Sequence, residues 1–152
     1  MMFDGNDGDY REEIITNNGF WPDVDLQDFQ RSRAIPTDIS ADFLADALIA
    51  TLTEVNGELS EVQKRHQANG FATAQDVPGV SRKGRNALCA QYLKAVFARA
   101  KADLLGEYTS IVSRAPNPQQ ESPDLRRRLL TESALVIRNM KGLKRATVKT
   151  IE

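Results

Sequence analysis

The chain has 152 residues, of which 41% are hydrophobic and 27% are charged, and its formal net charge is −1. This length and composition predict one domain with an apolar core and flanking arms. No apolar run approaches the roughly 20 residues of a membrane span, and the acidic, polar N-terminus does not resemble a secretory signal, so we expect a cytoplasmic protein.

The charges are unevenly spread along the chain. Residues 1–30 carry eight acids and one base, whereas residues 123–152 carry three acids and eight bases. Opposite charges at the two ends are typical of solvated arms, but they also suit attraction between neighbouring subunits of a head-to-tail oligomer.

The first 35 residues are predicted to form an N-terminal arm with a short helix. Phe20-Trp21-Pro22 places two large aromatic side chains beside a proline, and the acids that follow favour a short helix through Arg33. Pro36 ends this segment. We expect Phe20, Trp21 and Pro22 to dock on another surface.

Residues 36–142 are predicted to form an all-α helical bundle with two long helices and a shorter C-terminal helix. The first long helix begins after Asp38 or Ser40, which are good N-caps, and runs to Ala68. Its apolar residues recur every three or four positions and form one stripe: Leu44, Leu48, Leu52, Val55, Leu59 and Val62. Asn69-Gly70-Phe71 then predicts a helix stop with a left-handed glycine and an apolar residue that folds back.

The second long helix is predicted from Ser81 to Ser113, and its apolar positions are numerous enough to be covered on two sides. A Pro-rich loop follows, and Ser122-Pro123 marks the start of the third helix, with Lys141-Gly142 at its end. Residues 143–152 are β-branched and alternating, which favours an extended tail that needs a partner strand.

Catalytic chemistry has little support in this sequence. We find no phosphate-binding loop, nucleophile elbow or paired metal-ligand motif, and one Cys89 with one His66 does not supply a metal cluster. Cys89 is best explained as a small core residue, and His66 as a surface residue near a helix C-terminus. The sequence therefore predicts a protein that is not an enzyme and that holds neither metal nor cofactor.

Two basic clusters are candidate contact sites. Arg82, Lys83 and Arg85 crowd the predicted start of the second helix, where cations are unfavourable, and a second run covers residues 126–128. Such clusters suit nucleic-acid phosphates or an acidic protein surface, although most short basic runs are simply solvated.

With these elements placed, the chain resembles the head completion/stabilisation (GPL) proteins of temperate contractile-tailed bacteriophages. The resemblance covers most of residues 20–142. The segments that carry it are Phe20-Trp21-Pro22-Asp23-Val24-Asp25, Asn56-Gly57-Glu58-Leu59, Gly70-Phe71 through Asp76-Val77-Pro78, Tyr92-Leu93-Lys94-Ala95-Val96, Ala102-Asp103-Leu104 and Tyr108.

This resemblance implies a connector protein that joins the portal vertex after DNA packaging. It would close the filled head and provide a platform for a downstream head-tail joining or tail terminator protein. The resemblance further implies a ring, expected to be a dodecamer, in the virion neck. Packaged DNA would pass through this ring without sequence-specific binding.

Our leading hypothesis is therefore a structural neck adaptor that is assembled in the host cytoplasm. Its tail would bind the portal protein through Leu143, Lys144, Arg145, Val148, Lys149 and Ile151. Subunit or partner docking would use Phe20, Trp21, Pro22, Phe71, Tyr92 and Tyr108. The alternative is a small helical nucleic-acid-binding packaging or regulatory factor that uses the two basic clusters, and it predicts strongly salt-dependent DNA binding.

Overall fold

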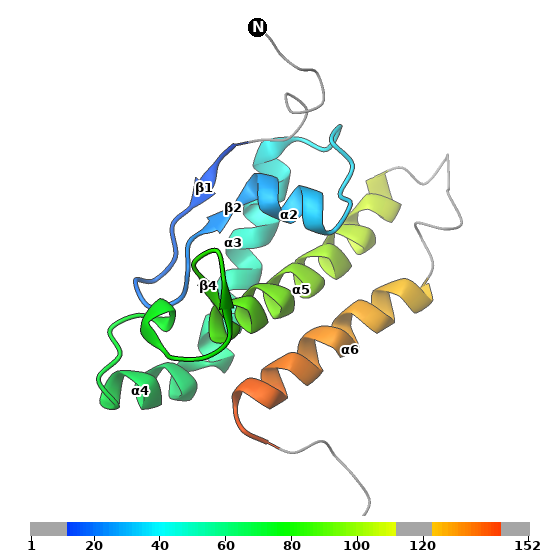
Figure 1. Cartoon of the computed structure of the whole chain (residues 1–152). Coiled ribbons are helices and arrows are strands. Elements are labelled where there is room, and N and C mark those ends of the chain that lie inside the picture. Colours follow the sequence, from blue (N-terminus) through cyan, green and yellow to red (C-terminus); the bar gives the residue numbers. More distant parts are fainter. Residues whose placement is uncertain (1–11, 112–122, 144–152) are drawn as a thin grey trace, which may run out of the picture.

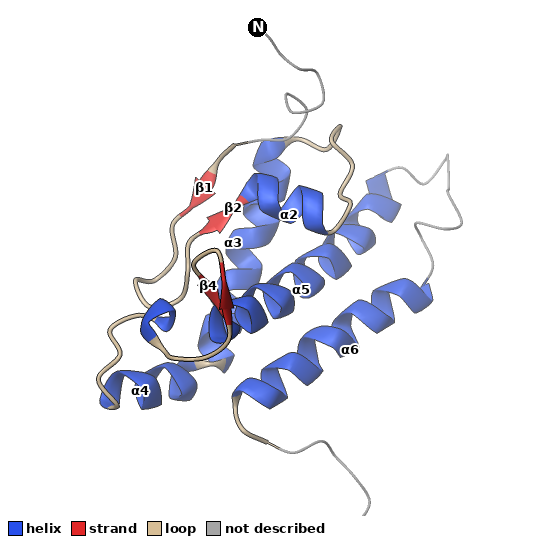
Figure 2. Cartoon of the chain, viewed as in Figure 1, coloured by secondary structure: helices blue, strands red, loops and turns tan. Residues whose placement is uncertain are grey.

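The computed structural model describes residues 12–111 and 123–143. In chain order the elements are β1 (Ile14–Ile15), β2 (Val24–Asp25), α2 (Leu26–Ser32), α3 (Ala41–Glu58), α4 (Ser60–Ala68), a 3-10 turn η1 (Ala74–Asp76), β3 (Ser81–Arg82), β4 (Arg85–Asn86), α5 (Ala87–Ile111) and α6 (Pro123–Met140). Helix α5 lies at the centre and packs against both α3 and α6 (Figure 1). The predicted all-α fold is confirmed in its main outline, with two small antiparallel ladders added to the helices (Figure 2).

The predicted first long helix is interrupted. Ser40 caps α3 as expected, because its Oγ accepts a hydrogen bond from the Phe43 N–H at 3.1 Å. The helix ends at Glu58, however, and Leu59 leaves helical geometry with φ −99° and ψ 14° before α4 begins. Gly57 lowers helix propensity just before this break. Leu59 and Val62 stay buried, so the apolar stripe continues across the bend into α4.

The predicted start of the second long helix at Ser81 is wrong. Residues 81–86 form the β3–β4 hairpin, in which Ser81 pairs with Asn86 and Arg82 with Arg85. Lys83 and Gly84 take positive φ angles of 51° and 79° in the connecting two-residue turn, the geometry that suits tightly twisted hairpins. Helix α5 therefore begins at Ala87, six residues later than expected, and its predicted end at Ser113 lies outside the described residues.

Two helix stops follow one pattern that the sequence predicted. At the end of α4, Gly70 has φ 98°, its N–H donates to Gln67 O, and the Phe71 N–H donates to His66 O. At the end of α6, the N–H groups of Gly142 and Leu143 donate to Asn139 O and Arg138 O in the same way. Both are Schellman motifs, in which a left-handed glycine lets the last carbonyls find donors.

Close packing of α6 on α5 depends on small side chains. Ala95, Ala98 and Ala102 of α5 are fully buried, and the Ser133 Oγ of α6 donates a hydrogen bond to Ala95 O at 2.9 Å. With α3 on its other side, α5 is covered on two sides, as its wide apolar face predicted. No helix in the described ranges is long and apolar enough to cross a lipid bilayer.

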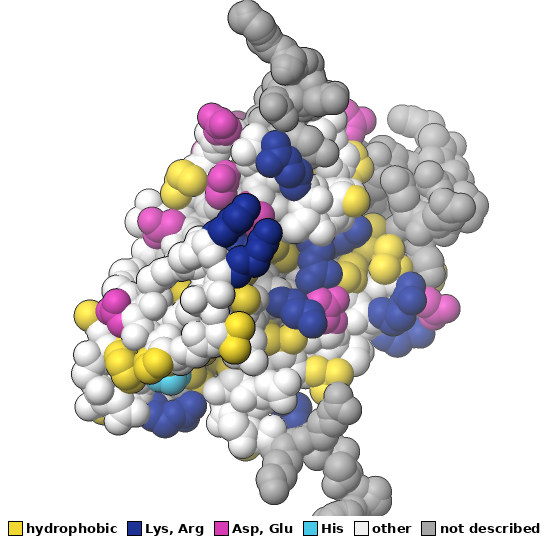
Figure 3. All heavy atoms as spheres, in the orientation of Figure 1, with side chains coloured by type: hydrophobic (Ala, Val, Ile, Leu, Met, Phe, Trp, Pro, Cys, Tyr) yellow, Lys and Arg dark blue, Asp and Glu magenta, His cyan; other side chains and the backbone are white. Residues whose placement is uncertain are grey.

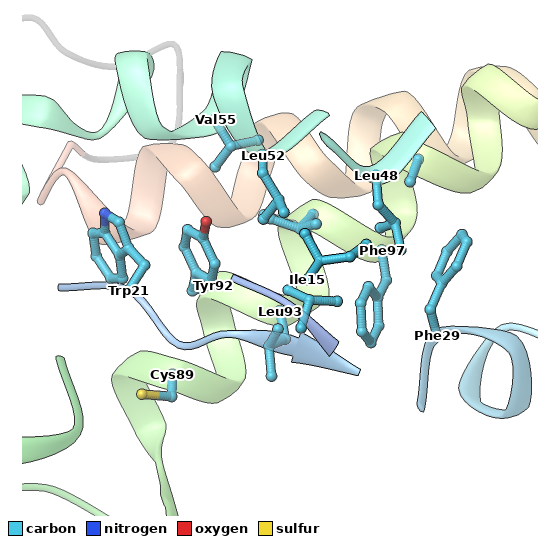
Figure 4. Packing of buried hydrophobic residues seen from close by; sticks show 14 of the residues in the cluster. Ile15, Trp21, Phe29, Leu48, Leu52, Val55, Cys89, Tyr92, Leu93 and Phe97 are labelled. Carbon is cyan, nitrogen blue, oxygen red and sulfur yellow. The ribbon is translucent and has the colours of Figure 1, made fainter. Parts of the chain in front are cut away.

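Residues 12–35 share one core with the helices. In this core Ile15 of β1 and Phe29 of α2 lie near Leu48, Leu52 and Phe97, and Trp21 lies beside Tyr92 (Figure 4). The short helix is confirmed as α2, with Asp25 Oδ1 accepting from the Gln27 N–H and Arg33 at its C-terminal end. Over its described part, the predicted N-terminal arm thus belongs to the helical domain, because its aromatic residues bury against α3 and α5.

Candidate assembly surfaces

Four side chains join the N-terminal segment to the helices, and we call them the junction: Asn17, Trp21, Asn56 and Tyr92. The Trp21 ring stacks on the Tyr92 ring of α5 with a centroid separation of 4.6 Å and an interplanar angle of 2° (Figure 4). Phe20 meets Trp21 edge-on at 4.8 Å. Aromatic burial of this extent fixes the path of residues 17–23 across the bundle.

A closed triangle of hydrogen bonds completes the junction. The Tyr92 hydroxyl donates to Asn56 Oδ1 at 2.6 Å, Asn56 Nδ2 donates to Asn17 Oδ1 at 2.8 Å, and Asn17 Nδ2 donates to the Tyr92 hydroxyl oxygen at 2.9 Å. Burial raises the pKa of Tyr92 far above its ordinary value, against the opposing effect of the Asn17 and Asn56 hydrogen bonds. The hydroxyl therefore stays protonated and acts as a donor.

These contacts change the expected role of several predicted docking residues. Phe20 and Trp21 are each 2% exposed and Tyr92 is 0% exposed, so these side chains are buried within their own chain. Pro22 and Phe71 are partly buried, and Phe71 packs near His66 at the end of α4. The Tyr108 side chain lies outside the described side chains. The docking partner of Phe20 and Trp21 is therefore the helical body itself.

Asn86 is a structural residue that sequence reasoning missed. Its Oδ1 accepts from the Cys89 N–H at 2.9 Å and caps α5, while its Nδ2 donates to Ala74 O at 2.8 Å, Gln75 O at 3.2 Å and Val77 O at 2.7 Å. One buried amide thus ties the start of α5 to the loop that carries η1. The available signal was an asparagine just before an apolar helix, but the earlier Ser81 offered a competing cap.

His66 lies between two aromatic rings rather than in open solvent. Its ring stacks on Phe20 at a centroid distance of 6.4 Å and approaches Phe71 at 6.5 Å. Burial, with a smaller effect from the Arg65 charge, lowers the pKa of His66 below its ordinary value.

Cys89 is buried at 2% exposure, as the sequence predicted, and burial raises the pKa of its thiol. Among the described residues, no group of three His, Cys, Asp or Glu side chains is placed to hold a metal ion.

Lys and Arg side chains gather over one face of the molecule, across the β3–β4 hairpin and the helices beside it (Figure 3). Part of this charge is neutralised within the chain. Arg33 forms a two-pronged contact with Glu132 of α6, at 2.7 and 3.2 Å, and Arg85 pairs with Asp28 at 2.9 Å. The Arg33 hydrogen bond lowers the pKa of Glu132. Arg82 and Lys83 are exposed on the hairpin.

The predicted basic clusters therefore differ in structure. Arg82, Lys83 and Arg85 belong to a hairpin that precedes α5, so the expected conflict with the helix dipole does not arise. The run at 126–128 diverges, because Arg126 Nε donates to Ala102 O at 3.2 Å while Arg127 pairs with Asp124 at 2.8 Å. Only some of these three residues can face one partner, as their spacing predicted.

An acidic groove lies away from the hairpin, between α3, α5 and the start of α6. Its volume is about 530 Å³, and its lining includes apolar Phe43, Ala47 and Leu104 together with Asp46, Asp103, Glu107 and Arg126. Burial, followed by the nearby Glu54 charge, raises the pKa of Asp103 above its usual value. The groove thus combines apolar walls with carboxylates at its margin.

The predicted portal-binding tail begins where α6 stops. Leu143 is 48% exposed and follows directly on the Gly142 turn. The other predicted tail residues, Lys144, Arg145, Val148, Lys149 and Ile151, lie outside the described residues.

Comparison with known proteins identifies the family. The model of the phage head completion protein (GPL) family matches residues 15–151. The chain belongs to the phage head completion protein family. It is 35% identical, over 97% of its length and 98% of the relative, to a probable head completion/stabilization protein of Haemophilus phage HP1. A head completion/stabilization protein of Escherichia phage P2 is 29% identical over 66% of this chain and 59% of the relative. No solved structure matches the chain.

Membership gives the coarse function and a role for the junction. Members of this family are structural components of the phage particle that complete the head. Three of the segments on which the resemblance rested, those containing Trp21, Asn56 and Tyr92, meet at the junction. These residues therefore support the fold of this head completion protein.

Proposed function

We propose that this head completion protein binds the portal vertex after DNA packaging and closes the filled head. The observation that best supports this proposal is the family match over residues 15–151, which spans the helical body and nearly all of the basic tail. The most prominent sequence motifs are used inside the fold, so partner contacts fall to the exposed faces and to the tail. A structural role in the virion neck agrees with this division.

The finer assembly follows the same proposal. Copies of the chain form a ring matched to the portal, expected to be a dodecamer, and the ring offers a platform to a head-tail joining or tail terminator protein. Packaged DNA passes through without sequence-specific contacts. Assembly takes place in the cytoplasm of the bacterial host, on portals that have finished packaging.

The tail is the proposed portal-binding element. Leu143 is exposed where α6 ends, and the following sequence alternates β-branched and basic residues. Val148 and Ile151 suit apolar sites beside the edge of a portal sheet, and Lys144, Arg145 and Lys149 provide charge for steering. Backbone pairing gives such a tail affinity, while alternate side chains give it specificity.

Portal binding by truncated chains tests the proposal. We would measure co-sedimentation of the cognate portal ring with the full chain and with chains that lack residues 143–152 or 144–152. The second truncation keeps Leu143, whose N–H donates to Arg138 O, so it leaves the end of α6 capped. Both truncations should abolish binding and keep the helical circular dichroism of the full chain.

Two point variants separate the two parts of the tail. Val148→Asp with Ile151→Asp should remove binding at any salt concentration, whereas Lys144→Ala with Lys149→Ala should slow association mainly at low salt. Full portal binding by the chain lacking 144–152 would reject the tail mechanism. Failure of the full chain to bind the portal ring would reject the proposed function itself.

Non-specific DNA binding is the second candidate function, and the basic face of the molecule favours it (Figure 3). Its test is the binding of duplex DNA across a salt series, because phosphate contacts release counterions and give a steep dependence on salt. Replacing Arg82 and Lys83 with alanine removes two possible phosphate contacts. The slope of the logarithm of the binding constant against the logarithm of the salt concentration should therefore become shallower by about two. If no DNA binds at low salt, this candidate is rejected.

A further inference from the structure

We propose that the β3–β4 hairpin of one copy docks into the acidic groove of a second copy. This inference rests on the proposed ring and names the two surfaces that would join neighbouring subunits. It is argued from the charge, exposure and placement of both surfaces in the single chain.

The groove has the composition of a site that receives a basic and partly apolar element. Phe43 and Ala47 of α3 and Leu104 of α5 provide apolar lining, and Asp46, Asp103 and Glu107 provide the carboxylates. None of these three acids forms a salt bridge with any residue in the ranges 12–111 and 123–143. The acids outnumber the single Arg126 in the lining. Arg126 and Arg99 already act on Asp103, so a partner cation would meet the more favourable field at Asp46 and Glu107.

The hairpin offers an exposed apolar side chain and the complementary charge. Val80 is 83% exposed just before β3, which makes it the most exposed large hydrophobic side chain of the described residues. Arg82 and Lys83 are exposed beside it, and neither forms a salt bridge with another described residue. One apolar side chain flanked by two cations matches apolar walls flanked by carboxylates.

The hairpin is also held firmly along its length. The Gln75 amide donates to Gly84 O in the turn, Arg85 of β4 pairs with Asp28, and at the base the buried Asn86 amide donates to three carbonyls of the preceding loop. A hairpin fixed in this way loses little conformational freedom when it binds. Its outward-facing residues are therefore prepared for contact before a partner arrives.

The positions of the two surfaces prevent a contact within one chain. The hairpin directly precedes α5 at Ala87, whereas the groove involves α5 residues 103–107. At 1.5 Å per residue the two lie about 25–30 Å apart along one helix. A contact between unlike patches on two copies is heterologous, and it produces rings when the rotation closes and filaments when it does not.

Charge exchange between the two surfaces tests the pairing without the portal. We would measure sedimentation velocity of the full chain up to several hundred micromolar at low salt. Arg82→Glu with Lys83→Glu, or Asp46→Lys with Glu107→Lys, should each weaken self-association about tenfold or more. A mixture of these two charge-reversed proteins, and a chain carrying all four changes, should associate again. Lys64→Glu with Lys141→Glu, at exposed positions of α4 and just after α6, is the matched control and should leave association unchanged.

Disulfide trapping provides a second readout when association is weak. In a Cys89→Ala background, a Val80→Cys chain mixed with an Ala47→Cys chain should form a crosslinked pair, because those sulfurs would lie close at the interface. An Ile14→Cys chain mixed with the Ala47→Cys chain is the control. A chain carrying both Val80→Cys and Ala47→Cys should give a ladder of crosslinked species.

Two results would overturn the proposed pairing. One is trapping of the Val80→Cys and Ala47→Cys chains at no more than the level of the Ile14→Cys control. The other is self-association that charge reversal on either surface leaves unaltered. Crosslinking with no portal binding would reject the proposed function and keep this interface. Portal binding with no crosslinking would keep the proposed function and reject this interface.

Discussion

The junction and the β3–β4 hairpin both connect chain outside the long helices to the helical body, yet they use their side chains in opposite ways. At the junction, Trp21 and Tyr92 are buried against each other, and the polar atoms of Asn17, Asn56 and Tyr92 satisfy one another. At the hairpin Gln75 holds the turn and Asn86 holds the base, while the Arg82 and Lys83 side chains are exposed. Stability thus depends on the first region, and contact with partners is expected of the second.

Replacement of Trp21 should break this contrast most strongly. Trp21 is 2% exposed and contacts both Phe20 and Tyr92, so Trp21→Ala leaves a large cavity beneath the N-terminal segment. We expect a loss of about 3–5 kcal/mol in the free energy of unfolding, measured by urea denaturation followed by circular dichroism.

Trp21→Phe is the matched control for that change. The Trp21 Nε1 atom is buried and has no hydrogen-bond partner among the described residues, so phenylalanine removes a costly group as well as some volume. This control should cost clearly less than Trp21→Ala. If Trp21→Phe lost as much unfolding free energy as Trp21→Ala, the cavity would not be the cause of the loss. A feature that only the indole ring has would then be responsible.

Asn86→Ala should have the next largest effect, because it disconnects the hairpin base and η1 from α5. The change removes the α5 cap and the donor to three carbonyls, and we expect a loss of about 2–3 kcal/mol. Ser40→Ala is the comparison, since Ser40 caps α3 through a single exposed hydrogen bond and should cost about 1 kcal/mol. If the two variants lose equal stability, the bonds to the loop contribute nothing.

Tyr92→Phe isolates the hydrogen-bond triangle from the aromatic packing. The variant keeps the ring against Trp21 and removes only the hydroxyl that donates to Asn56 and accepts from Asn17. We expect a loss of about 1–2 kcal/mol in unfolding free energy. A double-mutant cycle with Asn56→Ala should give a coupling energy above about 0.5 kcal/mol. Strict additivity would show that the triangle is not energetically connected.

Local rules of chain geometry account for the features that the sequence predicted correctly. Ser40 as a cap, Gly70 and Gly142 as stops, and the start of α6 at Pro123 each depend on neighbouring residues alone. The apolar stripes likewise indicated that α5 would be covered on two sides. Such signals need no knowledge of what lies elsewhere in the fold.

Features that depend on distant residues were harder to predict. The hydrogen bonds of the junction join residues 36, 39 and 75 positions apart, and no periodicity along the chain indicates them. Residues 81–86 were expected to be helical because Ser81 is a good cap. The hydrogen bonds from Asn86 to residues 74–77 instead favour Asn86 as the cap, and the hairpin then needs positive φ at Lys83. Phe20, Trp21 and Tyr92 were predicted to bind a partner but are buried in the core. Their burial also depends on residues far away in the chain, which local patterns do not reveal.

His66 offers a smaller effect that depends on pH. Burial against Phe20 and Phe71 lowers its pKa in the folded state, so the unfolded chain binds more protons near pH 6. Stability should therefore rise with pH in this range. The full contribution is present above the unfolded pKa of about 6.5 and is lost as the pH falls from there toward the folded pKa.

His66 is the single histidine of the chain, so its proton resonances can be followed by NMR without ambiguity. We expect a midpoint below 6.5 in the native protein. Phe71→Ala, which opens one side of the ring, should move the midpoint back toward that value. A native midpoint at or above the ordinary histidine value would contradict the partly buried placement of this side chain between Phe20 and Phe71.

The smallest effect is expected at the hairpin itself. Arg82 and Lys83 are exposed and form no salt bridge with another described residue, so Arg82→Ala with Lys83→Ala should change the unfolding free energy by less than about 0.5 kcal/mol. Arg85→Ala is the paired comparison, because it breaks the contact with Asp28 and should cost up to about 1 kcal/mol. A large loss from the Arg82 and Lys83 change would mean that these cations support the fold, and it would remove the contrast with the junction.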